Sequence, residues 1–109
     1  MKYALLIYSS DEVRNGPDRE SVFAEYEAIF DAPGIVTGLG LQRAESATTV
    51  RVENGEALLT DGPFVDAKEY LGGFYLFEAD NIDAATEMAA RIPAARMGGA
   101  VEVRPVMER

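Results

Sequence analysis

The 109-residue sequence contains no cysteine and no histidine. Without cysteine, the chain can form no disulfide, thiol nucleophile or thiolate metal site, and a reducing compartment is compatible with this composition. Without an imidazole, a histidine-containing triad and a histidine-ligated metal are excluded, so any proton transfer must use Asp, Glu, Lys, Tyr or water. We therefore expect neither a metal centre nor a cofactor.

Basic residues are also scarce. Ten Lys and Arg residues stand against 19 Asp and Glu residues, which gives a formal net charge of −9. Because affinity for nucleic acids comes from neutralising phosphates with Lys and Arg, we expect no nucleic-acid partner. The apolar N-terminal stretch ends at polar residues 9–12 without a small-residue cleavage site, which argues against a signal peptide. We expect a cytoplasmic protein that does not bind or enter a membrane.

Two amphipathic helices are expected. The first covers residues 19–30, where five apolar side chains recur with helical spacing. The second starts after Asp80, a suitable N-cap residue, and is stopped by Pro93. Residues 9–18 are polar and contain Asn-Gly-Pro, so we expect a loop there. The apolar stripe of the first helix consists of Val22, Phe23, Tyr26, Ile29 and Phe30.

Six strands complete the pattern, at residues 3–8, 35–42, 48–52, 57–60, 72–79 and 100–107. The first is apolar almost throughout, as expected of a central strand covered on both faces. Alternation along residues 72–79 places Phe74 and Leu76 on one face and Tyr75 and Phe77 on the other. Asn-Gly at 54–55 predicts a type I′ hairpin turn.

This order predicts an α+β fold, a ferredoxin-like split βαβ arrangement with an inserted β-hairpin and an antiparallel sheet. Two helices can cover only one face of a four-stranded sheet. A monomer would therefore expose an unusually large apolar patch. We expect a homodimer in which a second copy buries the other face, as a dimeric α/β barrel. No linker or internal repeat is visible, so residues 1–109 are expected to form one domain.

The stretch from residue 58 to 78 is the predicted functional surface. It contains the turn Asp61-Gly62-Pro63-Phe64, a charged segment and a second apolar strand. The predicted catalytic residues are Asp61 or Glu69 as the base and Lys68 as a cation for an anionic group. The predicted ligand-binding residues are Tyr8, Phe64 and Arg104.

Each candidate also has a structural interpretation. Asp61 can accept backbone N–H bonds in an Asx-type turn. Lys68 and Glu69 are adjacent, so they point apart and can belong to a solvated charge cluster. Arg104 can pair with Glu102 on the same strand, and Tyr8 can be a core or dimer-face aromatic residue.

Six short motifs occur in order, at residues 38–42, 47–51, 60–65, 68–69, 71–75 and 101–105. Together they resemble the YCII-related family, specifically its DGPF-domain branch, over nearly the whole chain. The resemblance implies a dimeric α+β barrel of ferredoxin-like subunits and a small-molecule site in a cleft beside the sheet. Better-studied YCII relatives carry a His and Asp pair proposed as catalytic, which does not transfer to a chain without histidine. DGPF proteins are often encoded beside extracytoplasmic-function sigma factors, which implies a possible regulatory context.

Three functions are compatible with these patterns. The protein can be a cofactor-free acid/base enzyme, isomerase- or lyase-like, acting on a small anionic or carbonyl-containing molecule. It can bind a metabolite without chemistry, in connection with sigma-factor-linked regulation, or it can be a dimerisation module. Apolar strand faces beside a charged turn are the usual build of a ligand cleft, which favours binding or catalysis.

Overall fold

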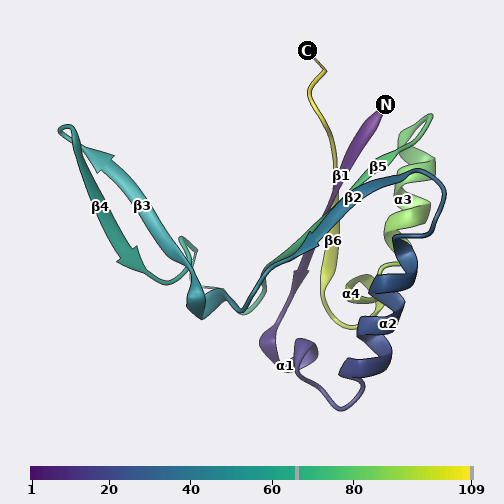
Figure 1. The fold of residues 1–109 in the computed structure, drawn as a ribbon, viewed down its shortest axis with the longest axis horizontal. Coiled ribbons are helices and arrows are strands. Elements are labelled where there is room, and N and C mark those ends of the chain that lie inside the picture. The colour runs from purple at the N-terminus through teal and green to yellow at the C-terminus, as the bar shows by residue number, and fades with distance from the viewer. Residues whose placement is uncertain (66, 109) are drawn as a thin grey trace.

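The computed structural model describes residues 1–65 and 67–108. It shows a four-stranded antiparallel sheet with helices on one face, and a two-stranded hairpin that stands away from the sheet (Figure 1). The predicted α+β class is therefore confirmed. The elements are β1 (Lys2–Ser9), α1 (Asp11–Arg14), α2 (Arg19–Ile29), β2 (Ile35–Gly40), the 3₁₀ turn η1 (Ala44–Ser46), β3 (Thr48–Glu53), β4 (Glu56–Asp61), β5 (Tyr70–Glu78), α3 (Ile82–Ala90), α4 (Pro93–Arg96) and β6 (Ala100–Pro105).

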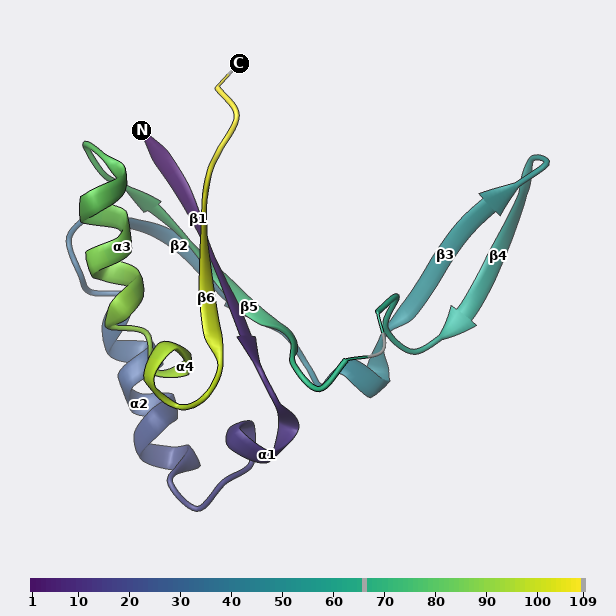
Figure 2. The same cartoon turned by 180° about the vertical axis from the view of Figure 1, so that it is seen from behind.

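The strand order in the main sheet is β2-β5-β1-β6, so β1 is central as predicted. Leu5 of β1 lies opposite Tyr75 of β5 and Val103 of β6. This register places alternate β1 residues on the face that α2, α3 and α4 cover (Figures 1 and 2). We call the opposite side the open face. It carries Ala4, Leu6, Leu39, Phe74 and Leu76.

The core lies between the sheet and the helices. Leu5 and Ile92 are fully buried, and the small residues of α3 let that helix approach the sheet closely. Phe74 and Leu76 are only half-buried, whereas Tyr75 and Phe77 are buried, so the predicted division of β5 between two faces is confirmed. The buried apolar residues are Tyr3, Leu5, Ile7, Ile29, Tyr75, Phe77, Ala85, Met88, Ala89, Ile92 and Ala94.

The hairpin of β3 and β4, residues 48–61, is called the arm below. Asn54 and Gly55 both have positive φ, 52° and 80°, which confirms the predicted type I′ turn. Val50 lies opposite Leu59 in the register between the two strands. The arm forms a sheet of its own, and both views show it well separated from the helices.

Several boundaries differ from the prediction. Residues 11–14 form the short helix α1 within the expected loop, because Ser10 caps it by accepting the Val13 N–H at 3.3 Å. Asp80 is not the N-cap of α3; Asn81 is, and its side chain accepts the Ala84 N–H at 2.9 Å. Pro93 does not simply end a helix, since it occupies the first turn of α4, where its missing N–H costs nothing. No helix in the described ranges is long and apolar enough to span a membrane.

The cap assignment at α3 is testable with two neighbouring substitutions. Asn81→Ala removes the acceptor for the Ala84 N–H and should lower the free energy of unfolding by about 0.5–2 kcal/mol. Asp80→Ala is the matched control and should change that free energy by less than about 0.5 kcal/mol. Urea denaturation followed by circular dichroism measures both values, and a larger loss for Asp80→Ala would refute the assignment.

Candidate functional site

A cleft of about 300 Å³ lies between α2 and the glycine-rich ends of β2 and β5. Its residues come from β1, α1, α2, β2 and β5, so segments far apart in the sequence meet there. Apolar and aromatic residues dominate the lining, and its charged side chains are Arg14 and Glu27. The residues on which the following paragraphs rest are Ser9, Arg14, Phe23, Tyr26, Phe30, Gly38, Gly40, Gly73 and Tyr75.

Glycines form the side of the cleft contributed by the sheet. Gly38, Gly40 and Gly73 lie on the face toward α2, as the register with Tyr75 shows. A Cβ at Gly38 would lie 2.6 Å from the Tyr75 ring, and one at Gly73 would lie 2.6 Å from the Leu39 carbonyl oxygen. At Gly40, in contrast, a Cβ would meet nothing within 4 Å. The cleft therefore exists because backbone replaces side chains on this part of the sheet.

Helix α2 forms the opposite side and does not pack as predicted. Of its predicted apolar stripe only Ile29 is buried, whereas Phe23 is 64% and Phe30 is 41% exposed. The physical reason is the glycine surface opposite them, which offers no side chains to interdigitate with the two rings. Phe23 and Phe30 line the cleft instead of filling the core.

Tyr75 connects the sheet to α2 at the inner end of the cleft. Its hydroxyl donates a hydrogen bond to the Tyr26 carbonyl oxygen at 2.8 Å, and the Phe30 ring meets it edge-on with centroids 5.3 Å apart. Burial raises the pKa of the Tyr75 hydroxyl, and burial also raises the pKa of Tyr26. Both phenols therefore stay protonated at neutral pH and can act as hydrogen-bond donors but not as bases.

Arg14 lines the cleft, and Arg19 lines a hollow beside it. Arg14, half-buried, donates to the Leu41 carbonyl oxygen, and an adjoining hollow of about 470 Å³ is lined by Arg14 and Arg19 together with Phe23 and Tyr26. Among residues 1–65 and 67–108, neither arginine has a carboxylate within ion-pair distance. The two arginines offer charge-assisted N–H donors to this hollow, whose lining also includes the carboxylate of Glu20.

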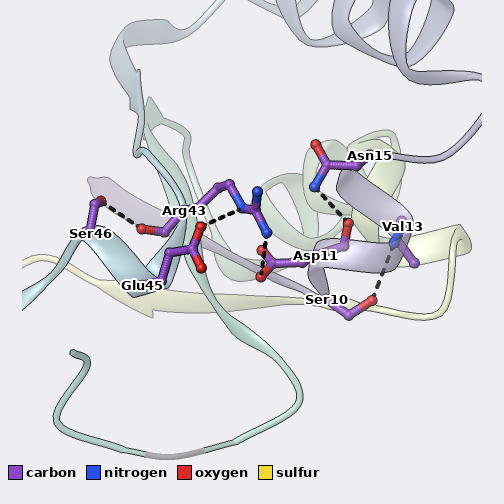
Figure 3. Close-up of polar contacts among 7 residues, drawn as sticks. All are labelled: Ser10, Asp11, Val13, Asn15, Arg43, Glu45 and Ser46. Carbon is purple, nitrogen blue, oxygen red and sulfur yellow. Dashed lines mark hydrogen bonds and ion pairs between the residues drawn. The ribbon is translucent and has the colours of Figure 1, made fainter.

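A polar network fixes α1 and hence Arg14 (Figure 3). Arg43, in the segment after β2, lies 3.9 Å from the Asp11 carboxylate of α1 and 3.4 Å from that of Glu45. The Leu41 N–H also donates to the Gly72 carbonyl oxygen at 2.9 Å. These contacts tie the segment that leads into the arm to both α1 and β5.

The turn predicted to be catalytic lies at the base of the arm. Asp61 is exposed at the end of β4, and Gly62, with φ of 102°, donates its N–H to the Ala47 carbonyl oxygen at 2.7 Å. Phe64 is 68% exposed, and the Arg51 guanidinium lies 4.8 Å from its ring centroid. The turn therefore closes the base of the arm.

The other predicted residues lie in different places. Lys68 and Glu69 are exposed in the segment before β5. Tyr8 lies on the open face, because it is two residues after Leu6 in β1. Arg104 pairs with Glu102, as its structural interpretation predicts. In the described chain, none of Asp61, Glu69, Lys68, Tyr8, Phe64 and Arg104 lines the cleft, so their roles stay predictions.

The cleft residues were partly visible in the sequence. Phe23 and Phe30 belong to the predicted amphipathic stripe, but no sequence pattern links Arg14, Arg19 or the glycines of β2 and β5 to it. The described residues contain no group of three or more carboxylates placed to hold a metal ion.

The fold and the cleft together define an α+β protein whose helix-covered sheet encloses an apolar, arginine-bordered hollow. The YCII-related domain model matches residues 1–109, and the chain belongs to the YCII-related family. It is also similar to an uncharacterized protein of Rhizobium meliloti (strain 1021), at 32% identity over 114 aligned residues that span 97% of this chain and 92% of the relative.

The role of the Tyr75 hydroxyl is testable through pH. An unfolded tyrosine loses its proton near pH 10, whereas the raised pKa delays this step in the folded protein, so stability should fall as pH rises above about 10. Tyr75→Phe should cost about 0.5–1.5 kcal/mol at neutral pH through the lost hydrogen bond. It should also make the alkaline loss of stability shallower. Urea denaturation at about pH 8 and about pH 11 measures both effects, and parallel losses in both proteins would contradict the assignment.

Proposed function

We propose that this protein is a cytoplasmic small-molecule-binding protein whose ligand is a small anion with an apolar or aromatic body. The observation that carries the proposal is the cleft of about 300 Å³, which has the rings of Phe23 and Phe30 on one side and Arg14 in its lining, with Arg19 in the adjoining hollow. This volume and this division between apolar lining and few polar groups are those of small-molecule sites.

Arg14 and Arg19 support an anionic ligand, and the carboxylates of Glu27 in the cleft and Glu20 in the adjoining hollow limit where its charge can lie. Arg14 is held by the Leu41 carbonyl oxygen, which fixes its direction and leaves further N–H donors available. A planar carboxylate fits such a donor group well. The half-buried Phe30 and the more exposed Phe23 would bury the apolar part of the ligand.

Matched probes test the charge requirement. Phenylacetate should raise the unfolding temperature of the protein, whereas the isosteric but uncharged phenylacetamide should not. Arg19→Gln should weaken phenylacetate binding by about tenfold or more, because it removes a charged donor, while Arg91→Gln, which changes the net charge equally outside the cleft, should leave binding unchanged.

Gly40→Leu provides the complementary steric test. The new side chain enters open space, so the protein should fold normally and lose phenylacetate binding by occlusion. Isothermal titration calorimetry measures the affinities of all variants. Equal affinities for wild type and Gly40→Leu would exclude this cleft as the site.

We also infer the DGPF branch of the family and a ferredoxin-like subunit that forms a homodimer. The motif at residues 60–65 supports the branch, and the strand order β2-β5-β1-β6 with its α2 and α3 crossovers supports the subunit type. A second copy over the open face would cover Leu6, Phe74 and Leu76, which one chain leaves half-buried. In such a dimeric barrel, Tyr8 and Arg104 would face the interior.

Acid/base catalysis is the second candidate. Its supporting observation is the closed base of the arm, where the Thr49 hydroxyl donates to the Gly62 carbonyl oxygen at 2.8 Å and holds the turn next to Asp61 in one conformation. Asp61 or Glu69 would act as the base, and Lys68 would bind an anionic or carbonyl oxygen. A cleft that binds without turnover would instead fit metabolite sensing linked to sigma-factor regulation.

Exchange of substrate protons with deuterium, followed by NMR across small carbonyl and lactone compounds, tests catalysis. Asp61→Asn or Glu69→Gln, whichever replaces the base, should lower the exchange rate by about 10²–10⁴-fold, and Lys68→Ala should also lower it. Glu53→Gln, at the far end of the arm, is the control and should not. Exchange that persists in Asp61→Asn, Glu69→Gln and Lys68→Ala, or that does not occur with the wild type, would rule out this function.

A further inference from the structure

The arm has one apolar face that the described part of the chain leaves exposed. The strand register places Val50 opposite Leu59 and Val52 opposite Ala57 on this face, and Thr49 opposite Thr60 on the other. Val50, Val52 and Leu59 are 58%, 68% and 69% exposed. A two-stranded hairpin is at best marginally stable alone in water, so this face needs a partner surface.

The molecule exposes more surface than a compact monomer of its mass would. Its radius of gyration is 15.5 Å, against about 13 Å for a compact domain of this length. Its accessible surface is 7656 Å², about 1,700 Å² more than the roughly 5,900 Å² of a compact monomer of this mass. Two copies that bury this excess would share about 3,500 Å², which lies within the range of obligate homodimers.

The open face of the main sheet is the second apolar surface without cover. Its central side chains are Leu6, Phe74 and Leu76. The charged strand residues on it balance in sign, because Lys2 lies opposite Glu78 and Arg104 pairs with Glu102. This face is therefore neutral in a chain of net charge −9, and contact between two copies there meets little electrostatic repulsion.

The arm is held away from the open face of its own chain. The figures show the arm and the main sheet diverging from a common base near η1. That base is tied to the body by Arg43 with Asp11 and by the Leu41 N–H with the Gly72 carbonyl oxygen. A second copy is the partner that supplies a matching open face and leaves, in turn, its own arm to be covered.

We propose that the arm is exchanged between two copies of this chain. Each arm packs the face formed by Val50, Val52, Ala57 and Leu59 against the open face of the other subunit, alongside the contact between the two sheets. With a two-fold axis, both arms and both open faces are covered at once. No copy of these surfaces is then left to bind a third chain. This assignment specifies how the proposed homodimer is made and does not depend on the ligand of the cleft.

Neighbouring residues on opposite faces of β4 provide the test. The wild type should have twice the chain mass of 11.8 kDa by native mass spectrometry and light scattering at micromolar concentration. Leu59→Glu should raise the dimer dissociation constant by more than about tenfold, because it places a charge in the arm contact. Thr60→Glu adds the same charge on the other face and should leave the constant unchanged.

Cross-linking gives a measurement that does not depend on dissociation. The chain has no cysteine, so Leu59→Cys and Leu76→Cys proteins can be mixed and treated with a short bis-maleimide without background reaction. A linked species of twice the chain mass containing one of each protein is expected. Thr60→Cys mixed with Leu76→Cys is the control and should link poorly.

Three results would overturn the proposal. A monomeric wild type would mean that a different molecule covers the arm. Equal dissociation constants for Leu59→Glu and Thr60→Glu would mean that the dimer does not use this face of the arm, and a failed Leu59–Leu76 cross-link in a stable dimer would exclude contact with the open face. None of these results would affect phenylacetate binding in the cleft, so the two proposals can fail separately.

Discussion

The structure depends on one constraint, which is that β1 and β5 carry large apolar side chains on both faces while helices reach only one of them. Leu5 and Tyr75 point to the helices and are buried, whereas Leu6 and Phe74 point the other way and are half-buried. Hydrophobic burial is the dominant favourable term in folding, so covering the second face would stabilise the protein. The core and the open face both follow from this arrangement, and the proposed homodimer is built on it.

On the helix side, the cleft results from a local exception to close packing. Glycines remove side chains from the sheet where the N-terminal half of α2 passes over it, and Tyr75 holds the C-terminal half of α2 in place through Tyr26 and Phe30. A second link joins Arg96 of α4 to Glu25 of α2 at 2.5–2.7 Å. The hollow is thus supported at both edges, which is what a preformed binding site requires.

Local chemistry predicted much of the fold. The Asn54-Gly55 turn, the central position of β1 and the alternation of β5 follow from backbone preferences and side-chain period, and all three are confirmed. The sequence does not distinguish Asp80 from Asn81 as the N-cap of α3, because both are good cap residues. Which of the two caps the helix depends on the residue at which the folded chain enters α3.

The cleft was harder to predict because it is made by contacts between distant segments. The spacing of Phe23 and Phe30 predicts a buried stripe. In the folded chain, glycines of β2 and β5 lie opposite these two rings, so the rings line a hollow instead. Arg14 likewise gains its position from the Leu41 carbonyl oxygen. The arm is a separate unit that contributes no residue to the buried core. In the proposed dimer, mutations in the arm would change which chains recognise each other and leave the cleft unaltered, so closely related paralogues in one cell would keep their subunits apart through a few hairpin side chains.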